Sequence, residues 1–80
     1  MIPLGNFFMS MVDAKAIGRF VAHVRKEQHV TQLELSQAAN VGRRFVVELE
    51  EGKDTLQVGK MLKVLDTLGV DVQLVAPEGV

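Results

Sequence analysis

The apolar positions of the chain begin to repeat with a helical period just after Asp13. Four of them recur at the i, i+3, i+4 and i+7 spacing of one buried helix face: Ile17, Phe20, Val21 and Val24. Asp13 stands where its carboxylate can cap the first turn of such a helix. The pattern predicts a helix over residues 14–28.

A second helix is marked by a capping box. Thr31 and Glu34 have the Thr-x-x-Glu spacing, in which each side chain accepts a hydrogen bond from the backbone N–H of the other residue. We therefore expect a helix to begin at Gln32. It should end near Ala39, because Asn40 tolerates the left-handed conformation that a tight turn requires.

A third short helix is predicted from Arg43 to Glu51. Gly42 is an acceptable cap before it, and Gly52 is a typical residue to end it. Only three or four residues then separate this helix from the one before. The sequence predicts two short helices joined by a tight turn.

The last part of the chain contains a fourth helix and one strand. Five apolar residues are expected to mark the helix: Val58, Met61, Leu62, Leu65 and Leu68. Gly69 should end it. Residues 70–75 then alternate, which predicts a strand with three apolar residues on one side: Val70, Val72 and Leu74.

Composition limits what this chain can be. Its 80 residues are 48% hydrophobic and 24% charged and include no cysteine, which is typical of one small domain in a reducing cytoplasm. We expect a flexible arm over residues 1–12, a domain over residues 13–75 and a short tail over residues 76–80. No segment is long and apolar enough to predict a membrane span. A domain of this size is marginally stable alone, so a homodimer is a reasonable expectation.

The charges of the third helix oppose its dipole. Arg43 and Arg44 stand at the positive end and Glu50 and Glu51 at the negative end, where each exposed charge costs about 0.3–1 kcal/mol. Helix stability therefore does not explain them. In a helix-turn-helix protein, however, the first residues of the second helix enter the major groove of DNA, where arginine can bond to guanine.

Two stretches of the chain resemble a known family. "VRKEQHVTQLELSQAANVGRRFVVELEEGK" resembles the Cro and phage-repressor-like, or XRE, helix-turn-helix proteins, and the resemblance covers residues 13–75. "TLQVGKMLKVLDTLGVDVQLV" is similar to the HipB-type antitoxin branch, in which a strand follows the fourth helix. The resemblance implies a mainly α fold of four helices with one C-terminal β-strand that pairs across a homodimer.

The resemblance also implies roles for individual residues. Gln32 would contact the DNA backbone or a base at the edge of the site, and Lys53 would contact phosphate. Gly42 departs from the family, which usually has Ser or Thr there, but as a glycine cap it leaves N–H groups open that can hold phosphate. Four residues of the third helix would lie at the DNA: Arg43, Arg44 and Glu48 at base edges, and Phe45 either at a thymine methyl group or in support of the turn. Arg25 and Glu50 match two family positions that form an interhelical salt bridge.

These observations predict a transcriptional repressor that binds double-stranded DNA at a specific sequence. The resemblance adds an antitoxin role, in which the chain represses its own operon and binds a HipA-like kinase toxin. A repressor without a toxin and a protein-interaction helix-turn-helix module are the alternatives. With no cysteine and two histidines that do not share a helix face, the sequence predicts no metal site, no cofactor and no enzyme activity.

Overall fold

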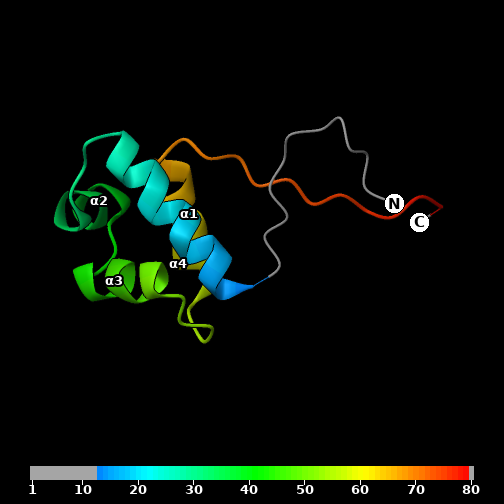
Figure 1. Ribbon diagram of the computed structural model, residues 1–80, viewed down its shortest axis with the longest axis horizontal. Coiled ribbons are helices and arrows are strands. Elements are labelled where there is room, and N and C mark those ends of the chain that lie inside the picture. Colours follow the sequence, from blue (N-terminus) through cyan, green and yellow to red (C-terminus); the bar gives the residue numbers. More distant parts are fainter. Residues whose placement is uncertain (1–12, 80) are drawn as a thin grey trace.

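The computed structural model describes residues 13–79. It contains the four expected helices in the expected order: α1 (Ala14–Glu27), α2 (Gln32–Ala39), α3 (Arg43–Glu51) and α4 (Val58–Thr67). Figure 1 shows α2 and α3 together at one end of the helical body. The expected arm over residues 1–12 lies outside the described residues.

The predicted caps determine where the helices begin. The Asp13 side chain accepts a hydrogen bond of 2.7 Å from the backbone N–H of Ala16. The capping box is complete, since Glu34 N–H donates to Thr31 Oγ1 at 3.0 Å and Thr31 N–H donates to Glu34 Oε1 at 2.9 Å. That backbone hydrogen bond from Thr31 holds the pKa of Glu34 below its usual value.

The first helix ends one residue earlier than predicted. Gln28 is the residue after α1, and its N–H still bonds back to the Val24 and Arg25 carbonyls. His29 then adopts a left-handed conformation with a φ of 57°, so the helix cannot continue past it. The Gln28 side chain also donates to the Leu68 carbonyl at 2.7 Å, which ties the end of α1 to the end of α4.

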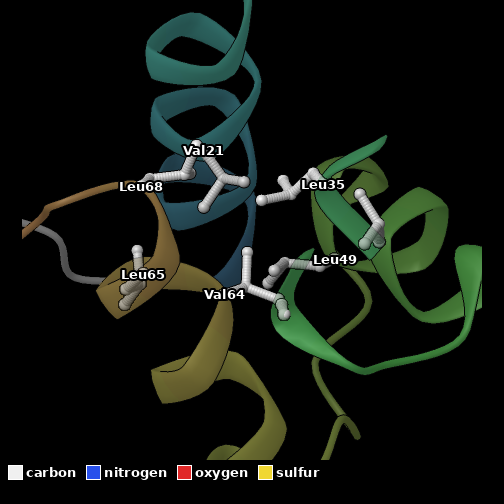
Figure 2. Packing of buried hydrophobic residues seen from close by; sticks show 8 residues of the cluster. Val21, Leu35, Leu49, Val64, Leu65 and Leu68 are labelled. Carbon is white, nitrogen blue, oxygen red and sulfur yellow. The ribbon is translucent and has the colours of Figure 1, made fainter. Parts of the chain in front are cut away.

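One apolar core joins all four helices. Figure 2 shows Val21, Leu35, Leu49 and Val64 pointing toward a common centre from different helices. The buried residues are Val21, Leu35, Ala39, Val46, Leu49, Val64, Leu65 and Leu68. In this arrangement α3 packs against α1 and α2, and α2 also packs against α4.

The five apolar residues expected to mark α4 do not all enter the core. Val58 and Leu62 are exposed, whereas Val64, which the spacing argument did not select, is completely buried. A helix with apolar residues on several sides offers more than one face to a core. The surface that α2 presents decides which face is used, and that surface arises only in the folded chain.

The C-terminal segment, residues 70–75, does not form the expected strand in the described part of the chain. Among residues 13–79 no strand is present, and Figure 1 shows the chain after α4 running away from the helical body. Of the three residues expected to share one side, Val70 packs against the core, while Val72 and Leu74 are exposed. A strand needs a neighbouring strand for its backbone hydrogen bonds, and residues 13–79 supply none for residues 70–75.

Candidate nucleic-acid interface

The interface is built on the tight turn between α2 and α3. Asn40 adopts the left-handed conformation expected of it, with a φ of 55°, and Val41 N–H bonds back to the Ser36 carbonyl at 3.0 Å. Ser36 is buried and its hydroxyl donates to the Leu33 carbonyl at 2.7 Å. These contacts hold the two helices of the unit in one fixed relation.

The start of α3 is open to solvent. Gly42 caps the helix with an extended backbone and supplies no side-chain hydrogen bond, so N–H groups of the first turn remain available. Arg43 and Arg44 follow, and both are exposed; the Arg44 side chain keeps 89% of its surface. A helix N-terminus with free N–H groups and two guanidinium groups favours an anionic ligand.

An open groove connects the starts of the two helices. It is lined by Arg25, Thr31, Gln32, Leu33 and Arg43. The structure therefore brings Gln32 and Arg43 together, although 10 residues separate them in the sequence. The groove lies at the N-terminal ends of α2 and α3. The positive ends of both helix dipoles therefore face any polyanion that binds in the groove.

A buried ion pair connects α1 to α3. Arg25 Nε donates to Glu50 Oε2 at 2.6 Å and Arg25 Nη2 donates to Glu50 Oε1 at 2.9 Å, so the pair is bidentate. Arg25 Nη1 also donates to the Val30 carbonyl at 2.9 Å. The hydrogen bonds that Arg25 donates to the Glu50 carboxylate raise the pKa of Arg25, against the opposing effect of burial. Arg25 therefore neutralises the negative charge that Glu50 places near the negative end of the α3 dipole.

Gln32 shares in the same network. Its side-chain amide donates to Glu50 Oε1 at 3.1 Å. A glutamine amide has two N–H donors, so one remains for a phosphate oxygen after this contact. The network fixes where Gln32 lies relative to α3.

Glu48 forms ion pairs with two cationic side chains, Arg44 of α3 and Lys53 just after it. Lys53 Nζ donates to Glu48 Oε2 at 3.1 Å, and Arg44 Nε lies 3.7 Å from the same oxygen. The hydrogen bond from Lys53 is the main reason that the pKa of Glu48 is lowered. Arg44, Glu48 and Lys53 therefore form one surface cluster, and two of the three glutamates of α3 have cationic partners.

Phe45 lies partly inside the protein. It is half-buried and packs against the core cluster. Of the two roles that the sequence left open for it, this position supports the one in which Phe45 stabilises the turn.

Sequence reasoning missed two positions, one where α1 packs against α3 and one on the groove. Gly18, in the middle of α1, lies so close to α3 that a Cβ atom there would collide with the Leu49 and Glu50 carbonyl oxygens. A glycine inside an otherwise regular helix was the available signal. Leu33 was also missed: it is exposed on the groove, one residue after the start of α2.

Two further properties concern the described part of the chain only. Residues 13–79 contain no group of three or more histidine and carboxylate side chains placed to hold a metal ion. None of the helices there has the length and apolar character needed to pass through a bilayer.

A family model described as "HTH_3: Helix-turn-helix" matches residues 21–75. The chain is also 54% identical over 61 residues to an uncharacterised HTH-type transcriptional regulator, y4mF, of Sinorhizobium fredii, a match that covers 76% of this chain and 80% of that protein. The chain belongs to the helix-turn-helix family of transcriptional regulators, which are generally not enzymes.

Solved structures share the same fold at low sequence identity. A structure of HipB in complex with an O4 20mer superimposes with a TM-score of 0.79 over 89% of this chain and 100% of that one, at 18% identity. A chain of a HipA-HipB-O2-O3 complex gives a TM-score of 0.80 with the same coverage and identity. These similarities show the four-helix fold.

Proposed function

We propose that the chain is a sequence-specific DNA-binding repressor that acts as a homodimer. The observation that carries this proposal is the exposed pair Arg43 and Arg44 at the uncapped start of α3, the second helix of a tight helix-turn-helix unit. Such an end fits the major groove, where guanidinium groups can bond to the O6 and N7 atoms of guanine. Membership of a family of transcriptional regulators supports it.

The other residues of the interface then take distinct roles. Gln32 and the open N–H groups after Gly42 bind backbone phosphates on either side of the groove. Lys53 also binds a phosphate, after leaving Glu48. Glu48 has its second oxygen, Oε1, available to accept a hydrogen bond from cytosine N4.

A dimer is required because one short recognition helix reads too few base pairs for tight binding. Two copies related by a twofold axis read half-sites about 34 Å apart. We propose that residues 70–75 of each copy pair as antiparallel strands and that Val72 and Leu74, both exposed in the protomer, become covered in the dimer. The contact of Val70 with the core would anchor this ribbon to each subunit.

The antitoxin role is the more specific part of the proposal. One similar solved structure contains HipA together with HipB, and we propose that this chain likewise binds a HipA-like kinase and represses its own operon in the cytoplasm. A stand-alone repressor is the alternative within the class. The decisive observation is whether a kinase-like reading frame adjoins the gene and its product co-purifies with the chain; if neither is found, the stand-alone repressor is the better description.

The DNA proposal is tested by binding measurements on two kinds of duplex. One is a sequence selected by the protein from a randomised pool and the other is a scrambled duplex of equal length. Arg43→Ala should lose about 1–3 kcal/mol on the selected duplex and relax the preference at one base pair. Arg19→Ala, at an exposed arginine of α1, is the matched control and should bind normally. Failure to select any preferred sequence would favour a protein-interaction module.

Lys53→Ala and Glu48→Gln separate phosphate contacts from base contacts. Lys53→Ala should weaken both duplexes alike and lower the slope of log affinity against log salt by about 1. Glu48→Gln should lose preference at one base pair. If Glu48→Gln instead tightens both duplexes equally, Glu48 is only a counter-ion for Lys53 and Arg44.

A further inference from the structure

Leu33 is an exposed apolar residue in a polar surface. It retains 49% of its surface, although the other leucine of α2, Leu35, retains 1% and belongs to the core. Leu33 lines the open groove together with Gln32 and Arg43. About half of its surface is therefore open to a ligand, in the groove that it shares with Arg43, which the proposed function places at the DNA.

Apolar groups are rare on the edges of DNA bases. In the major groove the C5-methyl group of thymine is the apolar feature that distinguishes one base pair from another. Phe45, the aromatic residue at the start of α3, is half-buried against the core, so its ring is largely committed there. Leu33 is left as the apolar side chain that the groove presents next to Arg43.

We infer that Leu33 is a specificity-determining residue that contacts the methyl group of a thymine adjacent to the base pair bound by Arg43. This inference rests on the proposed function, because it assumes that the groove between the starts of α2 and α3 faces DNA. It adds a reader from α2 to those on α3. The operator half-site should accordingly contain a thymine at one fixed distance from the guanine that Arg43 contacts.

The magnitude follows from the burial of one methyl group. Removing a buried methyl group costs about 0.8 kcal/mol, which corresponds to an affinity loss of about fourfold. Deoxyuridine lacks only this methyl group and keeps every hydrogen-bonding atom of thymine. Replacing thymines one at a time with deoxyuridine therefore measures the contact without altering base pairing.

The experiment is a deoxyuridine scan of the duplex selected by the wild-type protein, repeated with Leu33→Ala. Wild type should lose about fourfold in affinity at one thymine per half-site, and Leu33→Ala should lose none there. Leu33→Met, which keeps an apolar side chain, should retain the sensitivity. Leu62→Ala is the matched control: Leu62 is 43% exposed, but it lies on α4 and outside the groove.

Each other outcome overturns the inference in a recognisable way. An equal loss for wild type and Leu33→Ala at every sensitive thymine would assign the methyl group to another residue. Tight, selective binding with no sensitive thymine would show that Leu33 reads no methyl group, and the proposed repressor function would stand. If the wild-type protein selects no preferred sequence at all, the repressor function itself fails, and the inference fails with it.

Discussion

At Gly18, helix α1 lies very close to α3. Replacing this glycine with alanine should therefore destabilise the protein, whereas the same replacement at Gly59 should stabilise it. A Cβ atom at Gly18 would lie 2.8 Å from the Glu50 carbonyl oxygen and nearer still to that of Leu49, whereas an ordinary contact is 3.4 Å or more. Both obstructing atoms belong to the backbone, so no side-chain rotation relieves the collision. Gly18→Ala must move α3 away from α1.

The expected cost follows from two opposing terms. Alanine in a helix is favoured over glycine by about 0.5–1 kcal/mol. Overpacking a closely packed contact typically costs about 1–3 kcal/mol, and a rigid backbone contact belongs at the upper end of that range. We therefore expect Gly18→Ala to lower the free energy of unfolding by about 2–2.5 kcal/mol. For a domain of this size, each 1 kcal/mol lowers the melting temperature by about 4–8 °C.

Gly59→Ala provides the matched control. Gly59 lies in α4, it is exposed, and a Cβ atom there would meet nothing within 4 Å. The same substitution should therefore stabilise the protein by up to about 1 kcal/mol. Urea denaturation followed by circular dichroism at 222 nm measures both changes. If Gly18→Ala is as stable as wild type or more stable, the reasoning from the α1–α3 contact is wrong.

Three further predictions concern the scaffold and the assembly. Arg25→Ala should cost about 3–5 kcal/mol because it leaves the Glu50 carboxylate buried without its cationic partner, with only the Gln32 amide donating to it, whereas Arg19→Ala should change stability little; a double-mutant cycle of Arg25→Ala with Glu50→Ala that shows no coupling would contradict this. Gly42→Ser should raise the melting temperature slightly, since the site is open and serine is a better cap by a few tenths of a kcal/mol; a lower melting temperature would refute it. Val72→Pro should leave the helices intact but give monomers with weakened DNA binding, and ultracentrifugation that finds an intact dimer would exclude strand pairing at this residue.

The local rules of the sequence predicted the helices well. The capping box at Thr31, the left-handed Asn40 and the glycine after α3 act within one turn of the chain, so their effect does not depend on the rest of the protein. For the same reason the bounds of α2 and α3 agree with the prediction. The family resemblance also led to Arg25 and Glu50, which the structure places in one ion pair.

Long-range packing decided what the sequence left open. Whether Val64 or Leu62 of α4 enters the core depends on the surface of α2, and the need for a glycine at position 18 depends on backbone atoms of α3. The sequence likewise did not predict the hydrogen bond from Gln32 to Glu50. The two residues come within 3.1 Å only after α2 and α3 have packed together. The sequence by itself thus determined the four helices and the charges at the start of α3. Tertiary structure decided which helix faces meet, which side chains line the groove and where Leu33 lies, since these are relations between residues that are distant in the chain.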